Sequence, residues 1–424
     1  MDKYKKRVAD EILSFKLESK GAVLIEGTKW CGKTTTAMQI AKSSVSMQDS
    51  IESSNNIELA KIKPISLLEG TTPRLIDEWQ VAPRLWDAIR NEVDRRDAFG
   101  QFILTGSAVP ADLSQILHSG TGRITRMTMR PMSLFESEDS TGTVSLESLF
   151  DNHIDIEGKS NINLEKLAFL ICRGGWPKAL DCSEMVALEQ AFDWYDGVIN
   201  SDISRVDNVE RDKDRTVRIM RSYARSVASE TKLSSIARDI ISNESTSISV
   251  DTIGSYIKAL KKIFVIEDAT AWNPNLRSKT AIRSSDTHYF VDPSIATAAL
   301  GLGPKDLISD LNTMGLIFEN MAIRDLRTYA ERIHGTVYHY RDSNGLECDA
   351  VIHLRNGKYG LVEIKLGSED SIEEAARNLK KLESIIDTTK MHSPSFKMIL
   401  TGVGTYAYQR KDSVYIVPIG TLRD

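Results

Sequence analysis

Short apolar runs alternate with longer helix-like segments over about the first 130 residues of this 424-residue chain. Each run has the length of a strand, and the segments between them carry helical periodicity. Alternation of this kind predicts an α/β unit with a parallel sheet and helices on both faces. A first amphipathic helix within residues 1–20 would turn Val8, Ile12, Phe15 and Leu17 to the core, and the strands are expected at residues 22–26, 44–48, 74–77, 101–105 and 123–129.

The pattern changes after residue 130. Residues 136–163 are polar and rich in Ser, Thr and Asp, which predicts a loop or a flexible insertion. Helical periodicity returns over residues 164–230, interrupted by Cys172-Arg173-Gly174-Gly175-Trp176-Pro177. We expect this stretch to form a helical lid.

Residues 231–305 combine two capped helices with a basic segment. Thr231 would cap a helix at 233–242, and Ser249 would cap a second at 250–262. A strand-like run at 264–267 and another at 287–291 flank Arg277, Lys279 and Arg283. This is the outline of a winged helix, whose second helix would expose Thr252, Ser255, Tyr256, Lys258 and Lys262. Winged helices contact DNA or serve as protein-docking modules, and the sequence leaves both roles open.

The order of helix-like and strand-like segments near the C-terminus predicts a further α/β unit. Its expected order is a helix at 314–330, strands at 336–341, 347–354 and 359–365, a helix at 371–386, and strands at 396–400 and 413–418. The predicted fold class is therefore α/β with four parts, at residues 1–160, 161–230, 231–305 and 306–424.

The loop after the first expected strand has the chemistry of a phosphate site. Residues 27–34 read Gly-Thr-Lys-Trp-Cys-Gly-Lys-Thr, a complete G-x-x-x-x-G-K-[ST] motif between a strand and a helix. Its backbone N–H groups would wrap the phosphates of ATP, with Lys33 at the β- and γ-phosphates and the Thr34 hydroxyl on Mg²⁺. The predicted nucleotide-binding residues are Gly27, Thr28, Gly32, Lys33, Thr34, Thr35 and Asp77.

Two further strand ends carry polar groups that suit ATP hydrolysis. Asp77 and Glu78 follow the apolar run Leu75-Ile76, so Asp77 would complete the Mg²⁺ shell and Glu78 would act as general base on the attacking water. Thr105 follows the strand Phe102-Ile103-Leu104 and is placed to sense the γ-phosphate. Together with the phosphate loop, these residues predict ATP as a ligand and ATP hydrolysis as an activity.

A second constellation lies near the C-terminus. Glu363 and Lys365 share one face of an expected strand, and a turn at Asn356-Gly357 would bring Asp349 beside them. Two carboxylates and a lysine can hold a divalent metal and stabilise a phosphoryl transition state, with Glu319 as a fourth acidic group. The arrangement resembles the D-x(n)-E-x-K core of restriction-endonuclease-like nucleases. A simple ion pair on the strand face is the alternative.

Composition narrows the class of protein only slightly. A net charge of −5 argues against a surface coated for nucleic-acid binding, although a local basic patch is compatible with it. The four cysteines form no C-x-x-C pair, so we expect free thiols in a reducing, cytoplasmic setting and no zinc site. No apolar run approaches the roughly 20 residues of a membrane span, which predicts a soluble protein without a membrane partner.

The motifs together resemble one family along most of the chain. These are the prokaryotic AAA-type ATPases whose C-terminal half is a domain of unknown function with a restriction-endonuclease-like fold. The resemblance rests on residues 75–80, 104–107, 130–136, 173–177, 289–292 and 318–320, and on Glu347-x-Asp349 and Glu363-x-Lys365. It implies an AAA+ module that binds and hydrolyses ATP and works as a homo-oligomer.

By position in that family, Arg123 would be an arginine finger that reaches the γ-phosphate of a neighbouring subunit, with Arg126 as the competing candidate. The alternative for either arginine is a simple pair with a surface carboxylate. One departure concerns the lid, where many AAA+ proteins carry a sensor 2 arginine. Pro177 occupies that place here, and Lys178 or Arg173 are the possible substitutes. The predicted catalytic residues are thus Glu78, Arg123 and Thr105.

Two functions from different classes follow from the sequence. The first is an ATPase that uses ATP to control a winged helix and a nuclease-like domain in contact with DNA. The second is a non-enzymatic nucleotide switch whose C-terminal domain docks a protein. Glu78 favours the first, because a protein that only binds ATP does not need a base beside the Mg²⁺ ligand.

Overall fold

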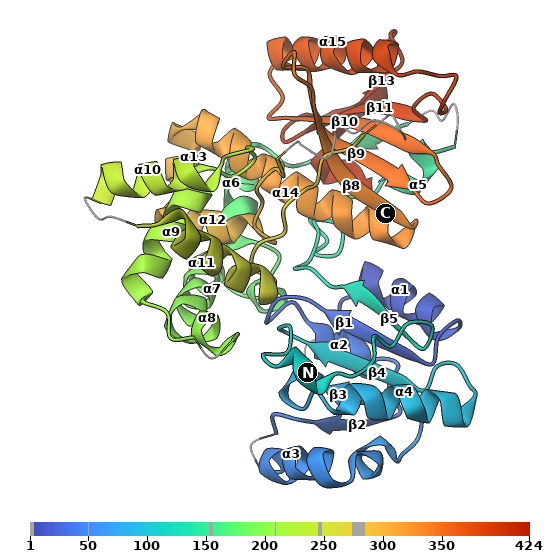
Figure 1. Cartoon of the computed structure of the whole chain (residues 1–424). Helices are drawn as coiled ribbons and strands as arrows, with labels where there is room; N and C mark the ends of the chain where they lie inside the picture. Colours follow the sequence, from blue (N-terminus) through green and yellow to red (C-terminus); the bar gives the residue numbers. More distant parts are fainter. Residues whose placement is uncertain (1–3, 50, 152–155, 208, 245–247, 274–284) are drawn as a thin grey trace.

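The computed structural model describes residues 4–49, 51–151, 156–207, 209–244, 248–273 and 285–424. Figure 1 shows three parts: an N-terminal α/β unit at the bottom, a group of helices beside it, and a C-terminal α/β unit above. The long helix α14 (Leu311–Arg332) runs between the helical group and the C-terminal sheet. No helix in the described ranges is both long enough and apolar enough to cross a membrane.

The N-terminal unit is built on a five-stranded parallel sheet with the order β2-β3-β4-β1-β5. The central strand β1 reads Ala-Val-Leu-Ile-Glu and is buried on both faces, which accounts for its unbroken apolar run. The strands are β1 (Ala22–Glu26), β2 (Ser43–Ser46), β3 (Arg74–Asp77), β4 (Phe102–Gly106) and β5 (Ile124–Thr128), within one or two residues of the prediction. The helices are α1 (Val8–Leu17), α2 (Lys33–Met38), α3 (Ser53–Ile62) and α4 (Leu85–Arg96).

One apolar assignment on α1 is wrong. Val8, Ile12 and Leu17 are buried as expected, but Phe15 is 55% exposed, and its ring contacts that of His334 in a tilted arrangement. Helix α1 buries Ala9 and Leu13 instead, which lie on the same face of the helix at i+4 spacing.

The helical group follows the N-terminal unit in the chain. Its elements are α6 (Leu164–Arg173), α7 (Glu184–Gly197), the π-helical turn η5 (Val198–Asp202), α8 (Ile203–Arg205), α9 (Lys213–Arg225), α10 (Leu233–Glu244), α11 (Val250–Lys262), α12 (Pro293–Leu300) and α13 (Pro304–Ser309). Ser249 caps α11 by accepting the N–H of Thr252, as its sequence predicts.

The segment expected to be a winged helix has the two helices but no strands among its described residues. Isolated bridges join Ile266 to Phe290 and Ala269 to Thr287 in place of the expected β-hairpin. Arg277, Lys279 and Arg283 lie outside the described residues. The expected exposure of Tyr256 is wrong: its ring is buried and its hydroxyl accepts the N–H of Asp212, because α11 packs this face against the start of α9.

The C-terminal unit is a mixed seven-stranded sheet with the order β7-β12-β13-β11-β10-β9-β8. Strands β10, β11 and β13 are parallel, and the β8-β9-β10 meander is antiparallel. Its main elements are β8 (Gly335–Arg341), β9 (Glu347–Leu354), β10 (Tyr359–Lys365), α15 (Glu369–Ile385), β11 (Phe396–Thr401), β12 (Tyr406–Gln409) and β13 (Val414–Pro418). Strand β12 has no counterpart in the sequence prediction.

The expected loop or flexible insertion at 136–163 is wrong for several of its residues. Strand β6 (Val144–Ser145) pairs with β14 (Leu422–Arg423), and β7 (Gly158–Lys159) pairs with β12. The short helix α5 (Leu146–Leu149) lies between them. These strands are two residues long, too short for a periodic signal, and their partners β14 and β12 lie far away in the chain, near the C-terminus.

A buried ionic network joins all three parts. Arg324 on α14 pairs with Asp292 and Asp325 at 2.8 Å, and all three residues are at most 2% exposed. Asp325 accepts the N–H of Leu134, which follows the N-terminal unit, and Asp292 accepts the N–H of Gly175 in the helical group. The network therefore holds the C-terminal helix against both other parts.

We predict that Arg324→Met destabilises the protein by about 3–5 kcal/mol, because two buried carboxylates lose their only strong counter-charge. Thermal unfolding followed by circular dichroism should show a large fall in Tm. The matched control is Arg225→Met, since Arg225 pairs with Asp239 at the surface, where such a pair contributes about 1 kcal/mol or less. Equal effects of the two substitutions would contradict a central role for the network.

Candidate functional site

The loop between β1 and α2 has the backbone of a phosphate cradle. Gly27 has φ +156°, and a Cβ there would lie 2.0 Å from the carbonyl oxygen of Met129. Gly32 has φ +100° and precedes the first turn of α2. Both positions therefore require glycine, and the chain can turn tightly from the strand into the helix.

Lys33 and Thr28 supply polar groups inside this loop. The Lys33 side chain is buried, and its Nζ donates to the carbonyl oxygen of Thr28 at 2.7 Å. No carboxylate of the described residues lies within ion-pair distance of Lys33, and the buried Thr28 Oγ1 has no hydrogen-bond partner there. A buried cation without a carboxylate and an unpaired hydroxyl fit a polyphosphate ligand.

Asp77, at the end of β3, contacts both the phosphate-loop motif and the neighbouring strand β4. Its Oδ1 accepts from the Thr34 hydroxyl at 2.7 Å and from the Thr105 hydroxyl at 2.6 Å. Thr105 reaches Asp77 because β4 lies between β1 and β3 in the sheet. A carboxylate and a hydroxyl this close are suitable ligands for the Mg²⁺ of a bound nucleotide. Thr35 is exposed on the next position of α2.

Glu78 leaves the strand in a left-handed conformation, with φ 56° and ψ 46°. This turns its carboxylate toward β4, where Ser107 donates to Oε2 at 2.8 Å and the Gln80 amide donates to the same oxygen. The Glu78 N–H donates to Thr105 at 3.2 Å. The predicted base is thus held in a defined orientation beside the metal ligand Asp77.

The helical group contacts the phosphate loop directly. Lys29 in the loop pairs with Asp202 in the π-helical turn η5 at 2.6 Å, and its carbonyl oxygen accepts from the Trp194 indole at 3.2 Å. A cavity of about 310 Å³ opens between these groups and residues Gln80 and Ser107. π-Helical turns inside helices occur often at functional sites.

The two sensor 2 candidates differ in position. Arg173 is buried and pairs with Asp139 at 2.8 Å, so its guanidinium is not available to a nucleotide. Lys178 is exposed and follows Pro177, whose Cγ lies 3.7 Å from the place of a Cβ on Gly32. Of the two, only Lys178 is next to the phosphate loop.

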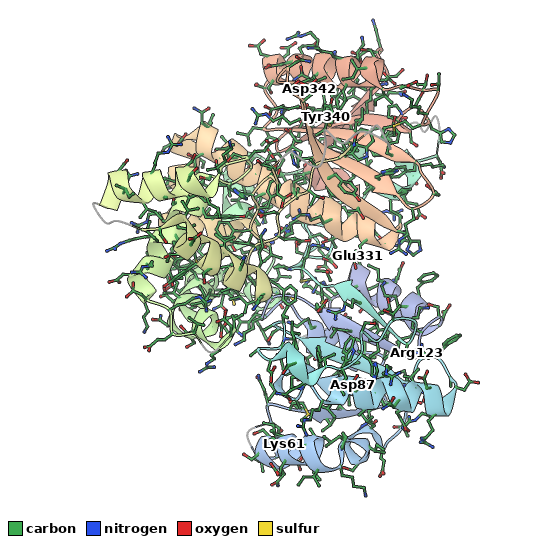
Figure 2. All side chains as sticks on the ribbon, in the orientation of Figure 1. Lys61, Asp87, Arg123, Glu331, Tyr340 and Asp342 are labelled. Carbon is green, nitrogen blue, oxygen red and sulfur yellow. The ribbon has the colours of Figure 1, made fainter. Side chains whose placement is uncertain are left out.

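The two arginine-finger candidates are both exposed on the N-terminal unit. Arg123 precedes β5 and pairs with Asp94 on α4 at 2.7 Å, and Figure 2 shows it at the outer side of that unit. Arg126 lies on the edge strand β5, pairs with Glu26 at 2.6 Å and covers the Trp86 ring. Among the described residues, both arginines bond to carboxylates outside the phosphate loop, Arg123 to Asp94 and Arg126 to Glu26.

The C-terminal cluster forms where β9 and β10 separate. The ladder between these strands ends at Ala350 and Val362, and the Asp349 carboxylate accepts the next N–H, that of Ile364, at 2.7 Å. Lys365 Nζ lies 3.0 Å from Asp349 and 2.7 Å from Glu363. The structure therefore brings the three sequence-predicted residues together around one ammonium group.

Burial gives this cluster unusual proton affinities. Desolvation, with the Asp349 charge second, raises the pKa of Glu363 to about 8. The Tyr289 hydroxyl donates to Oε1 of Glu319 on α14 at 2.6 Å. Desolvation, followed by the charge of Asp349, raises the pKa of Glu319 well above the usual range. The Glu363 Oε1 atom is buried without a hydrogen-bond partner in the described residues.

These groups fit a cation site only in part. Among the described residues, no group of three or more His, Cys, Asp and Glu side chains is arranged to hold a metal ion. Asp349 and Glu363 can each offer an oxygen atom, but the Lys365 ammonium now stands between them. A divalent ion would have to share the two carboxylates with Lys365 and displace a proton from Glu363.

Sequence reasoning did not identify several residues of these sites. Gln80, which holds Glu78 together with Ser107, follows the motif residues within three positions and could have been found by its distance from the strand end. Asp202 and Trp194, which contact Lys29, lie about 170 residues away in the chain and had no local signal.

Three family models match separate parts of the chain. Residues 19–138 match an AAA domain, residues 164–306 a domain of unknown function (DUF8612), and residues 314–422 a second domain of unknown function (DUF4143). No curated protein matches the chain. The AAA match and the parallel sheet with its phosphate loop show that the chain contains a P-loop ATPase-like domain.

Solved structures give more distant matches. The chain is similar to the Walker-type ATPase PABY2304 of Pyrococcus abyssi, with 15% identity and a TM-score of 0.42 over 70% of this chain and 96% of that one. A RuvB variant of Thermotoga maritima has 16% identity and a TM-score of 0.27, over 61% and 87% of the two chains. The Hef helicase domain of Pyrococcus furiosus has 11% identity and a TM-score of 0.20, over 93% and 89%.

We predict that the C-terminal cluster binds Mn²⁺ more tightly as the pH rises. Below pH 8 a proton occupies Glu363, so the apparent affinity should rise by roughly tenfold per pH unit and level off above it. Isothermal titration calorimetry at pH 6, 7, 8 and 9 checks this.

In the same titration, Asp349→Ala should remove the binding event. The matched control is Glu347→Gln, an exposed carboxylate two positions earlier on β9 that pairs with Arg341 at the surface. Binding that is independent of pH, or that survives Asp349→Ala, would place the ion elsewhere.

Proposed function

We propose that the protein hydrolyses ATP with Mg²⁺ and uses this reaction to control its C-terminal unit, which contacts DNA. The observation that carries the ATPase part is the meeting of Thr34, Thr105 and Asp77 through two short hydrogen bonds. The hydroxyls of Thr34 and Thr105 thus meet at one oxygen of Asp77, which supports the roles proposed for them as nucleotide-loop ligand and sensor beside a metal ligand.

Each group has a separate role in this proposal. The Gly27–Lys33 backbone and the Lys33 ammonium bind the phosphates, and Thr34 and Asp77 hold the metal that bound Mg-ATP supplies. Glu78 orients and deprotonates the attacking water, and Ser107 and Gln80 keep its carboxylate at the end of β3. Thr105 links the orientation of Asp77 to that of Glu78 through its hydroxyl.

A contiguous set of contacts supports coupling between the nucleotide site and α14. Trp194 bonds the Lys29 carbonyl and stacks on Trp176 with ring centroids 4.7 Å apart. The Trp176 indole donates to Ser294 at 2.9 Å, beside Asp292, which is the partner of Arg324. A shift of the phosphate loop therefore has a physical route to the C-terminal unit.

The C-terminal role rests on the cluster of Asp349, Glu363 and Lys365. With a divalent metal, such a cluster can polarise a phosphodiester, and Lys365 can stabilise the charge that develops. Contact with DNA is further supported by Lys258 and Lys262, which lie on one side of α11. We assign metal-dependent phosphodiester cleavage as the reaction of this cluster.

A non-enzymatic ATP switch with a docking C-terminal domain is the second candidate. Its specific support is the contact of the Lys365 ammonium with both acidic side chains, since a lysine held between two acids can also serve as a structural cluster. The two functions differ in one measurable respect, which is turnover of ATP.

We predict that Glu78→Gln lowers the rate of ATP hydrolysis by about 10²- to 10⁴-fold and leaves ATP binding intact, because only the proton acceptor is lost. Lys33→Ala should instead abolish tight ATP binding. A phosphate-release assay and equilibrium binding of a fluorescent ATP analogue measure the two effects.

The control for both variants is Glu58→Gln, an exposed carboxylate on α3 of the same unit that pairs with Lys61. Hydrolysis at the wild-type rate by Glu78→Gln would remove Glu78 from the catalytic role. Absence of hydrolysis by the wild-type protein with every nucleic acid tested would favour the switch.

We predict that Arg123 acts on a neighbouring subunit. Arg123→Ala should lower the rate by about 10³-fold or more, and mixing it with Lys33→Ala should restore part of the activity at shared interfaces. The control is Arg90→Ala, since Arg90 also pairs with Asp94 but lies earlier on α4. A wild-type rate for Arg123→Ala would transfer the role to Arg126 or indicate a monomeric mechanism.

A further inference from the structure

A cavity lies in the C-terminal unit, beside the end of β11. This strand neighbours β10, which carries Glu363 and Lys365 of the C-terminal cluster. Thr401 at the end of β11 is the register partner of Lys365 on β10 and of Pro418 on β13. Neighbouring residues in register on a parallel sheet share a face, so Thr401 and Lys365 point to the same side. The cavity has a volume of about 280 Å³ and is lined by Gly367, Ile372, Thr401, Tyr406, Tyr408 and Pro418.

Two tyrosines form the outer wall of this cavity. Tyr406 and Tyr408 alternate with the buried Ala407 on β12, so their rings stand on the same face of the strand. They are 62% and 47% exposed, which is unusual for adjacent large rings on one face. Same-face residues on a strand are about 6.8 Å apart, which is twice the roughly 3.4 Å stacking distance of nucleic-acid bases.

The floor of the cavity carries an unpaired polar group. Thr401 is only 1% exposed, and its Oγ1 has no hydrogen-bond partner in the part of the chain that the structure describes. A hydroxyl can both donate and accept, and leaving it buried and unpaired costs about 1–3 kcal/mol. A hydroxyl without a hydrogen-bond partner among the described residues, in a cavity lined by two exposed aromatic rings, can bind a planar ligand with polar edges.

We propose that this cavity binds one base of an unpaired nucleic-acid strand, stacked on Tyr406 and Tyr408 and hydrogen-bonded to Thr401. This inference rests on the proposed function, because it places the phosphodiester next to that base beside Lys365. Base stacking on aromatic side chains is tolerant of sequence, so the pocket selects for unpaired bases more than for a particular base. A paired base in a duplex cannot enter, since its edge and both faces are occupied.

Binding of a labelled oligothymidylate tests the proposal, measured by fluorescence anisotropy on the full chain with EDTA present so that no metal-dependent step occurs. Tyr406→Ala and Tyr408→Ala should each weaken binding by roughly tenfold, which is the usual effect of losing one stacking ring. Tyr406→Phe and Tyr408→Phe should bind like the wild type, because the ring is kept. Thr401→Val should weaken binding by a smaller factor.

The controls address folding and the form of the ligand. Phe15→Ala removes a ring of similar exposure on α1 and should leave binding unchanged. Tm values of the tyrosine variants should match the wild type, since both rings are at the surface. The same sequence in a duplex should bind more weakly than the single strand, and free thymidine monophosphate should displace it only at much higher concentration.

The outcomes separate this inference from the proposed function. Three results would each contradict binding of an unpaired base in this cavity. They are alanine variants that bind like the wild type, a duplex that binds as tightly as the single strand, and equal competition by the free nucleotide. If strand binding depends on the tyrosines but neither Mn²⁺ binding nor cleavage is found, the base-binding cavity stands and phosphodiester cleavage is rejected. If metal binds at Asp349 but strand binding does not depend on the tyrosines, the metal cluster stands and the base-binding cavity is rejected.

Discussion

The buried charge of Arg324 is the constraint on which the arrangement of the three parts depends. An arginine with no exposed surface is tolerated only if carboxylates meet it with good geometry, and here Asp292 and Asp325 each lie 2.8 Å away. Burial raises the pKa of Asp325 to about 6, and the charge of Arg324 and the N–H of Leu134 oppose this rise. The network thus combines groups from α14, from the helical group and from the segment after the N-terminal unit.

A second ionic contact lies at the same boundary. Arg130, just after β5, pairs with Glu267 at 2.6 Å and with Glu331 at the end of α14 at 3.1 Å. Figure 2 shows Glu331 where the C-terminal helix faces the N-terminal unit. The charge of Arg130 lowers the pKa of Glu267 to about 2 against the opposing effect of burial. The end of the N-terminal sheet is thus joined to α14 by an ion pair.

The two candidate sites use charge in opposite ways. At the nucleotide loop, Lys33 is buried without a carboxylate partner in the described residues, so a polyphosphate supplies the missing negative charge. At the C-terminal cluster, Lys365 is already paired twice, and the groups that resist ionisation are the carboxylates Glu363 and Glu319. The first site therefore has a positive charge unpaired within the described residues, whereas at the second any cation would compete with protons and with Lys365.

Local sequence was sufficient for the elements that carry a period or a fixed motif. The strands of the N-terminal sheet, the phosphate loop with Gly27 and Lys33, and the pairing of Glu363 with Lys365 follow from alternation and spacing, since these contacts are close in the chain. The cap at Ser249 follows for the same reason.

Only the tertiary structure decided the contacts between distant segments. The pairing of β6 with β14, the bond between Lys29 and Asp202 and the burial of Tyr256 depend on partners more than 40 residues away, and a short strand or one exposed-looking side chain carries no local trace of them. The same holds for the cavity at Tyr406 and Tyr408, because a strand of four residues lines a cavity only together with residues of β11 and β13. Periodicity indicates which face of a helix or strand is buried. Which other element packs on that face is decided only by the assembled fold.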